Sequence, residues 1–281
     1  MLSGEDSRRD AVKAIMSSGQ RELVAELERL DGGARFGRPA PRVRLLENGD
    51  VFERASVCMT SADGNGFFTT GLSVVIHPRN PYVPALQAQF RYCASGSAWW
   101  FGGAAELLPC YGFAEDAAHF HRVLKNYCDT LDPAFHAQAK RAGDDHFRLP
   151  HRDEPHGIGG IAFDHLRPPG PHGWRRAAAF TAAGIATIAP AYLPIVRRRR
   201  ELPHGERERQ WQLYRRGRYV ELALFRAASA ARADAEAILM TLPPLARWEP
   251  ELTPEPGSPE ADLASFLVPR DWAGETVATI S

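Results

Sequence analysis

Cysteine is scarce in this sequence, and the cysteines that occur are far apart. There are four, Cys58, Cys93, Cys110 and Cys128, and no two of them have the C-x-x-C spacing of a metal or redox motif. Small secreted domains depend on paired cysteines, whereas a chain in a reducing compartment does not. This usage fits a reducing cytosol better than a disulfide framework, and we therefore expect a cytoplasmic protein.

An excess of charge and a long apolar run are also missing. Lys and Arg together number 34, as do Asp and Glu, so the formal net charge is zero and indicates neither a nucleic-acid nor a membrane partner. Residues 1–9 are polar and lack the apolar segment of a signal peptide. The longest candidate for a membrane span, residues 177–196, is rich in alanine and contains Pro190 and Pro194, which predicts a buried helix instead.

The pattern of the chain predicts both helices and strands. Helices are expected at residues 5–29 (with a division near 17–19), 114–130, 174–190 and 205–214, and from Ser258 onward. Strands are expected at residues 71–77, 86–93, 98–102, 158–164, 217–226 and 236–242, with a hairpin at 43–59 around Asn48 and Gly49. Without regular βαβ alternation, this order predicts a single α+β domain over residues 1–281 with a mainly antiparallel sheet.

One predicted strand, residues 86–93, separates polar from apolar side chains. The two alternating sets are Gln87, Gln89 and Arg91 against Leu86, Ala88, Phe90 and Tyr92. Successive side chains of a strand point to opposite faces, so one face of the sheet is polar there. Ser73 and His77 share one face of a neighbouring strand in the same way. This polar face fits a ligand-binding surface, and the alternative is a face that simply meets solvent.

Longer motifs extend through most of residues 32–272. They are Ser-Val-Val-Ile-His-Pro-Arg-Asn-Pro-Tyr-Val-Pro at 73–84, Trp-Trp-Phe-Gly-Gly at 99–103, Glu-Asp-Ala-Ala-His-Phe-His-Arg at 115–122, Gly-Ile-Gly-Gly at 157–160, Gly-Glu-Arg-Glu-Arg at 205–209 and Tyr-Arg-Arg-Gly-Arg-Tyr-Val-Glu at 214–221. In these motifs the sequence closely resembles the oxygen-dependent coproporphyrinogen III oxidases.

The resemblance implies a fold, an activity and an assembly. The fold is a large, flat, mainly antiparallel sheet covered by helices on both faces, paired as a homodimer. The activity is the oxidative decarboxylation of two propionate side chains of a porphyrinogen to vinyl groups in haem biosynthesis. Dioxygen is the co-substrate, and no metal or organic cofactor is required.

Such an enzyme must hold carboxylates, hold pyrrole N–H groups and move protons. Arginine pairs with carboxylates bidentately, a partly buried carboxylate accepts from pyrrole N–H groups, and histidine carries protons near neutral pH. Matching to the family gives catalytic roles to His77, Glu106 and Gln87. The same matching gives substrate-binding roles to Ser73, Gln89, Arg91, His151 and Arg152.

Each of these assignments has a structural alternative. Ser73 can be an ordinary strand serine, His77 a strand-end histidine bonded to the backbone, and Arg91 one half of a salt bridge. Arg215, Arg216 and Arg218 alternate at the start of a predicted strand, so at least one is expected to face the substrate, and we assign Arg218. The glycines at 157–160 either permit close backbone approach or supply a turn with positive φ.

Metal is a further alternative suggested by the resemblance. His77, His121 and His151 match histidines considered as metal ligands in relatives, and three histidines can hold a divalent ion. Their spacing is dispersed. His119 and His121 lie two apart on a predicted helix and face different directions, so they do not form a joint pair.

Several positions depart from the family pattern. Gln87 stands in place of the proposed proton-donor histidine, Gln89 in place of an asparagine, and Glu106 in place of the aspartate that holds the pyrrole N–H groups. The loop at 226–237 is shorter, and Asp234 aligns with an arginine that binds a substrate carboxylate. Three readings follow: coproporphyrinogen III oxidase, an oxidase or decarboxylase of another carboxylated electron-rich ring, and a non-catalytic porphyrin-binding protein.

Overall fold

The computed structural model describes residues 4–229 and 235–275. Its centre is a six-stranded antiparallel sheet in the order β1-β2-β3-β4-β5-β8. The strands are β1 (Val43–Glu47), β2 (Phe52–Gly64), β3 (Phe67–Pro78), β4 (Ala85–Ser95), β5 (Ala98–Leu108) and β8 (Gly160–Leu166). The short strands β6 (Arg148–Leu149) and β7 (Glu154–Pro155) pair with each other. The α+β prediction is confirmed.

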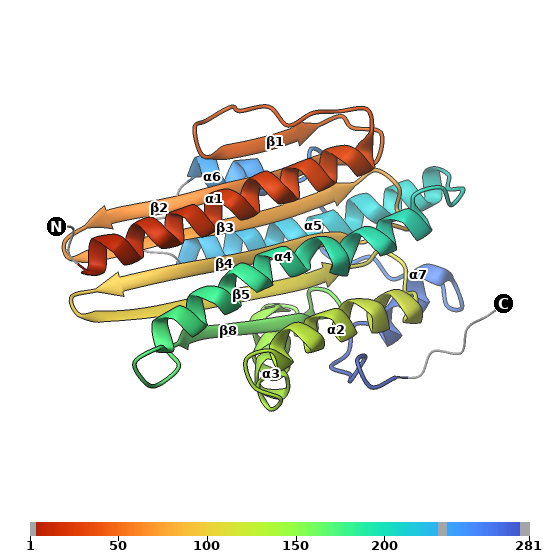
Figure 1. The fold of residues 1–281 in the computed structure, drawn as a ribbon. Helices are drawn as coiled ribbons and strands as arrows, with labels where there is room; N and C mark the ends of the chain where they lie inside the picture. Colours follow the sequence, from red (N-terminus) through yellow and green to blue (C-terminus); the bar gives the residue numbers. More distant parts are fainter. Residues whose placement is uncertain (1–3, 230–234, 276–281) are drawn as a thin grey trace.

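Helices cover both faces of this sheet (Figure 1). On one face lie α1 (Gly4–Asp31), α2 (Ala114–Asp129) and α4 (Gly173–Arg199). On the other lie α5 (Glu206–Ser229) and α6 (Ala235–Thr241). Helix α3 (Phe135–His146) packs on β8, and α7 (Pro259–Asp262) with the short 3₁₀ turn η1 (Leu263–Ser265) follows near the C-terminus.

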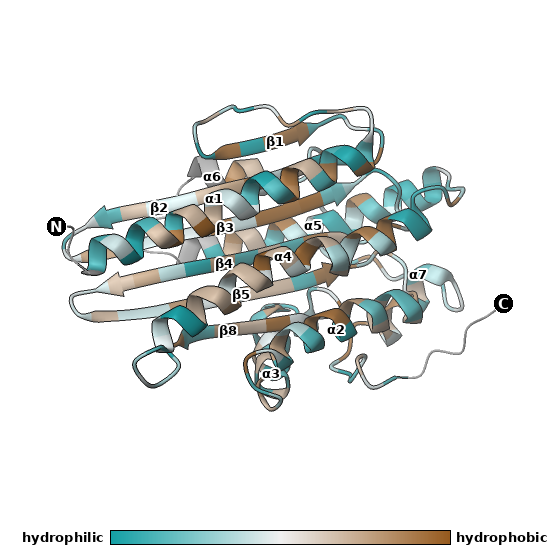
Figure 2. Ribbon diagram, viewed as in Figure 1, coloured by the Kyte–Doolittle hydropathy of each residue, from teal (hydrophilic) through white to brown (hydrophobic). Residues whose placement is uncertain are grey.

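The face under α1, α2 and α4 holds the main hydrophobic core. Leu72, Val74, Leu86, Phe90 and Tyr92 point to it and are almost fully buried. Figure 2 shows α1 alternating hydrophilic and hydrophobic residues along its length, as expected of a helix with one face on a core. The outward polar residues of the same strands therefore point to the α5 side.

One helix, α4, is long and apolar enough to span a membrane by length and composition. In this structure it packs on α1, α2 and the sheet, and more than half of its most apolar window is buried. Its apolar character is accounted for by this packing, as the sequence predicted for residues 177–196. The helix continues through Pro190 and Pro194 to Arg199.

One predicted helix break and two predicted strands are wrong. Residues 17–19 do not divide the first helix, since α1 is continuous from Gly4 to Asp31. A Cβ at Gly19 would lie 2.4 Å from the Ile185 side chain, so this glycine allows close packing of α1 on α4. Residues 217–226 are not a strand but belong to α5, and in place of the strand predicted at 236–242 the structure has α6, which ends at Thr241. Gly217 continues α5, and a Cβ there would lie 2.5 Å from the Arg247 carbonyl oxygen.

Turn and cap chemistry agree better with the prediction. Asn48 has φ 56° in the β1–β2 turn, the left-handed conformation that asparagine tolerates. The Ser258 hydroxyl accepts a hydrogen bond from the Ala261 backbone N–H at 3.2 Å, with Pro259 as the first residue of α7. The sequence missed α3, β6 and β7, and the strands predicted at 71–77, 86–93 and 98–102 are shorter than β3, β4 and β5.

Candidate active site

The polar face of the sheet lies where the alternation placed it. The register pairs Ser73 with Gln89 and Gln87 with Glu106, so these side chains share one face of β3, β4 and β5. Two contacts identify that face as the one under α5 and α6. His77 bonds the Thr241 carbonyl of α6 at 2.9 Å, and its ring meets the Tyr219 ring of α5 edge-on at 4.9 Å.

Glu106 is the most buried polar residue of this face. Its side chain is 0% exposed, and one oxygen, Oε2, bonds Nδ1 of His156 at 2.8 Å. His156 is equally inaccessible, with 1% of its side chain exposed. Glu106 Oε1 and His156 Nε2 have no hydrogen-bond partner in the part of the chain that the structure describes. Buried polar atoms are usually paired, so two adjacent exceptions indicate a place for a ligand.

The glycines at 157–160 hold this pair in place, and they do so in both of the ways considered. Gly159 has φ +72°, which favours glycine. At Gly157 a Cβ would lie 2.4 Å from the Leu107 carbonyl oxygen and 3.0 Å from Glu106 Oε1, and at Gly160 it would lie 1.9 Å from the Ala105 carbonyl oxygen. The segment therefore runs flat against β5 and carries His156 onto Glu106.

His77 lies near the same end of this face, two strands away from Glu106, and its ring and that of His156 both lie beside the Tyr219 ring. Burial, reinforced by the positive charge of Arg216, lowers the pKa of His77 to about 3, so the ring is neutral at neutral pH. Its bond to Thr241 then assigns the hydrogen to Nε2, because a carbonyl oxygen only accepts. His77 thus lies on the polar face as predicted, and it also makes the backbone bond of the structural alternative.

A pocket of about 230 Å³ opens between β4, β5, β8 and α3. Its polar lining comes from Gln89, Arg91, His146 and Asp164. Arg91 Nη2 donates to Asp164 Oδ2 at 2.6 Å, and the Arg91 side chain keeps 41% of its surface exposed. Arg91 therefore meets both of its sequence readings, because it lines a pocket and also forms a salt bridge.

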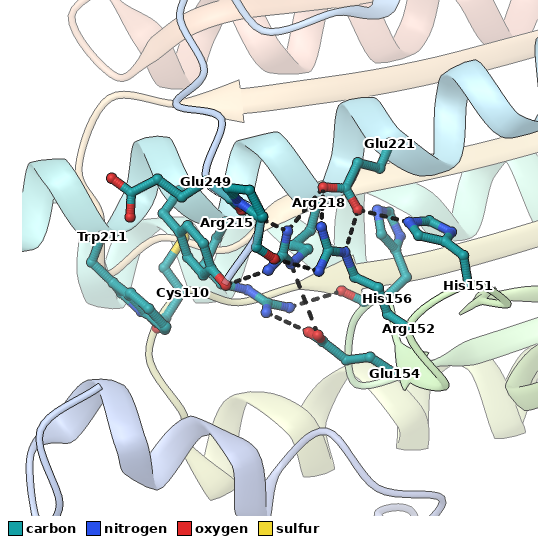
Figure 3. A network of polar contacts seen from close by, with 12 residues as sticks. Cys110, His151, Arg152, Glu154, His156, Trp211, Arg215, Arg218, Glu221 and Glu249 are labelled. Carbon is teal, nitrogen blue, oxygen red and sulfur yellow. Dashed lines mark hydrogen bonds and ion pairs between the residues drawn. The ribbon is translucent and has the colours of Figure 1, made fainter. Parts of the chain in front are cut away.

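The other predicted substrate-binding cations gather elsewhere, around Glu221 of α5. Arg152 donates to both Glu221 oxygens at 2.6 and 2.9 Å, His151 bonds Oε2 at 3.0 Å, and Arg218 donates to Oε1 at 2.9 Å. Figure 3 shows these side chains pointing at the carboxylate. Burial raises the pKa of Glu221, but the bonds from Arg152 and His151 outweigh it and bring that pKa to about 2.

The neighbouring arginines of α5 also have carboxylate partners. Arg215 donates to Glu154 at 2.6 Å, and Arg216 donates to Glu53 at 2.8 Å. Since residues 214–221 form a helix and not a strand, these side chains spread around α5 instead of alternating across a sheet. The prediction that at least one of these arginines faces the substrate was argued from a strand, and the structure has a helix there.

The three histidines considered for metal do not come together. His77 bonds Thr241, His121 bonds the Ile158 carbonyl at 3.1 Å, and His151 bonds Glu221. Over residues 4–229 and 235–275, no group of three His, Cys, Asp or Glu side chains is arranged to hold an ion. The metal assignment to His77, His121 and His151 therefore has no support in this arrangement of the described residues.

The altered loop is only partly visible. Asp234 lies outside the described residues, and side chains are described only as far as Arg226 at the end of α5. Arg226 donates to the His146 carbonyl at 2.9 Å, beside the pocket. Burial lowers the pKa of Arg226, while the nearby charge of Glu106 opposes this. A cation thus reaches the polar face from the start of the altered loop.

Comparison with known proteins agrees with this geometry. The family model for coproporphyrinogen III oxidase matches residues 11–272. This chain belongs to the coproporphyrinogen III oxidase family. It is 38% identical to the oxygen-dependent coproporphyrinogen-III oxidase of Parasynechococcus marenigrum (strain WH8102), over 98% of this chain and 90% of the relative. It is 37% identical to the enzyme of the same name from Synechococcus sp. (strain CC9902), with the same coverage.

Members of the coproporphyrinogen III oxidase family can be longer than this chain. The first of these alignments covers 328 positions, which exceeds the 281 residues here by 47, so at least 47 positions have no counterpart in this chain.

Sequence reasoning named Glu106 but missed His156, although His156 directly precedes the Gly-Ile-Gly-Gly motif. That adjacency was the available signal.

Proposed function

We propose that this chain is an oxygen-dependent oxidase that decarboxylates propionate side chains of coproporphyrinogen III to vinyl groups. Membership of the coproporphyrinogen III oxidase family, over nearly the full length, supports the reaction class. The observation that carries the site assignment is the buried carboxylate of Glu106, with one oxygen free, on a polar sheet face. A free carboxylate oxygen in a dry site is suited to accept pyrrole N–H groups.

The remaining polar residues suit the substrate's carboxylates. Arg91 is half exposed in the pocket and can exchange Asp164 for a propionate, while Ser73 and Gln89 stand opposite each other on β3 and β4. Dioxygen is the co-substrate and takes the two electrons released at each propionate. The reaction needs no metal or organic cofactor in this proposal, because the electron-rich pyrrole reduces dioxygen itself.

A second candidate is an oxidative decarboxylase for a less anionic ring. The observation that favours it is the pairing of cations with protein carboxylates, Arg91 with Asp164 and Arg152 with Glu221. A substrate with four propionates would have to displace these pairs, whereas a ring with fewer carboxylates would not. Gln87 favours the same alternative, since an amide does not transfer protons near neutral pH.

Aerobic incubation with coproporphyrinogen III separates these candidates. Vinyl products and oxygen uptake are followed together, with Glu106→Gln as the inactive control. Turnover supports the first proposal. Binding of coproporphyrin III without turnover of the porphyrinogen indicates the non-catalytic porphyrin-binding reading, and neither binding nor turnover favours the second candidate.

The assembly is proposed separately. We expect a homodimer in the cytoplasm, on the family resemblance and on a net charge of zero, which leaves little repulsion between protomers. Light scattering should give twice the 31.0 kDa of one chain, and a mass of 31.0 kDa at micromolar concentration would contradict the dimer.

A further inference from the structure

His156 is held more firmly than an ordinary loop residue. Its backbone N–H donates to the Phe147 carbonyl at 3.0 Å, and its carbonyl accepts from Arg215 Nη2 at 3.3 Å. The next residue, Gly157, lies against β5. The imidazole is thus fixed from both sides of the chain, with Nδ1 directed at Glu106.

The bond to Glu106 sets the roles of the two ring nitrogens. Nδ1 carries the hydrogen that Oε2 accepts at 2.8 Å, because a carboxylate only accepts. Nε2 then remains as the nitrogen that can exchange a proton, and it is unpaired among the described residues. A carboxylate that orients an imidazole in this way is a common arrangement for a proton carrier.

The charged and titratable groups around this pair come from α5 and the sheet. The Tyr219 ring lies 5.8 Å from the His156 ring, and burial raises the pKa of Tyr219 to about 12, so it stays neutral. Arg226 places its charge near Glu106, and Arg215 bonds the His156 backbone. None of these groups occupies Nε2.

The other candidates for proton transfer on this face are weaker. Gln87, the cross-strand partner of Glu106, carries an amide. His77 is neutral and uses its Nε2 hydrogen on Thr241. His77 also has an unpaired nitrogen, Nδ1, but a backbone carbonyl holds its ring. His156 is instead oriented by the buried carboxylate of Glu106, and its Nε2 is unpaired among the described residues.

We propose that His156 is the proton carrier of this enzyme, oriented by Glu106 Oε2, while Glu106 Oε1 accepts a pyrrole N–H. The inference rests on the proposed function. At the pyrrole that reacts, a different ring from the one held by Oε1, Nε2 takes the N–H proton while the ring gives two electrons to dioxygen. Nε2 returns the proton to that nitrogen after carbon dioxide leaves. At each propionate the β-carbon loses a hydrogen as a proton, and the electron pair left behind restores the oxidised ring. The bond to the carboxylate then breaks, carbon dioxide leaves, and the electron pair of that bond forms the vinyl double bond. The reduced dioxygen takes that hydrogen as a proton and a second proton from solvent, leaving as hydrogen peroxide.

Two variants of His156 test this assignment. His156→Asn keeps an N–H donor for Glu106 but has no second nitrogen, and His156→Gln places an amide near the Nε2 position. Neither amide transfers protons near neutral pH. His119→Gln is the matched control, since His119 bonds the Pro190 carbonyl on the opposite side of the sheet. Measurements are kcat and KM with coproporphyrinogen III, binding of coproporphyrin III, and the thermal midpoint.

For the variants that fold, we expect kcat to fall about 10²–10⁴-fold with binding and midpoint near wild type, while His119→Gln keeps wild-type kcat. Adding Gln87→His, which puts an imidazole across from Glu106, should recover at least about tenfold of the loss. Wild-type kcat in either His156 variant overturns the inference. It is also overturned if the fall in kcat is accompanied by an equal loss of coproporphyrin III binding and a lowered thermal midpoint. Absence of turnover by the wild type overturns the proposed function, and this inference with it.

Discussion

Two carboxylate clusters lie at α5, one partly exposed around Glu221 and one buried around Glu106, and they differ in how their charges are met. Around Glu221, both carboxylate oxygens accept from Arg152, His151 and Arg218. Around Glu106, one oxygen is bonded and the other is free. A carboxylate with all its partners inside the protein adds to stability, whereas one with an orphan oxygen keeps capacity for a ligand. The unsatisfied cluster is therefore the better candidate for chemistry.

The largest effect is expected from Glu106→Gln. This change removes the charge that holds pyrrole N–H groups and orients His156, so kcat/KM should fall about 10²–10³-fold. Stability should stay at or above the wild-type level, because the buried charge disappears and the amide oxygen still accepts from His156. Steady-state kinetics and urea unfolding measure the two quantities. Full activity in this variant would remove Glu106 from the site.

Glu221→Gln should give the opposite result. Arg152 and Arg218 lose a charged partner, which should cost about 2 kcal/mol of unfolding free energy. The catalytic constant should change little, since the orphan atoms at Glu106 and His156 are untouched. A loss of kcat as large as that of Glu106→Gln, without a loss of stability, would mean that the Glu221 cluster is the substrate site after all.

Stability should also fall as pH is lowered from neutrality. Burial brings the pKa values of His77 and His121 to about 3, below the ordinary 6.5, so the unfolded chain binds more protons between these values. Each histidine should contribute a loss of up to about 1.4 kcal/mol per pH unit from about pH 6.5 down to about pH 3. Urea unfolding across this range measures the slope, which should be shallower in His121→Gln. An unchanged slope would contradict a neutral buried His121.

The smallest effect concerns the Arg91–Asp164 pair. If Arg91 exchanges this partner for a propionate, Asp164→Asn should lower the KM for coproporphyrinogen III about two- to fivefold, which corresponds to the typical worth of an exposed ion pair. Arg91→Ala should raise KM. Should both variants raise KM, the pair would have to position the pocket as a unit.

The sequence predicted the sheet better than the helix that covers it. Alternation at 86–93 and the turn at Asn48 are local signals, and both hold in the structure. Helix α5 was misread at its second half because it buries Arg216 and Arg218 against Glu53 and Glu221. Charged residues of this kind resemble an exposed surface in sequence, and only the tertiary pairing shows why they are inside.

The same reason explains the candidate site. Family matching identified Glu106, His77 and Arg91, and all three lie on the polar face or its pocket. Family matching did not predict the ion pair between Arg152 and Glu221 or the hydrogen bond between His156 and Glu106. Both contacts join residues about 50 or more positions apart in the sequence. Pairing across such separations is decided by the fold and not by local pattern.

The strand order also has a consequence for how the chain folds. Strands β1 to β5 pair with one another in sequence order, so these pairings close short loops and can form early, whereas β8 joins β5 across a longer connection. The contacts that place α5 over the polar face join Arg209 and Arg216 to Glu53, more than 150 residues away. We therefore expect the sheet to assemble first and the site to be covered last, so that hydrogen exchange protects β3 and β4 before α5 during refolding.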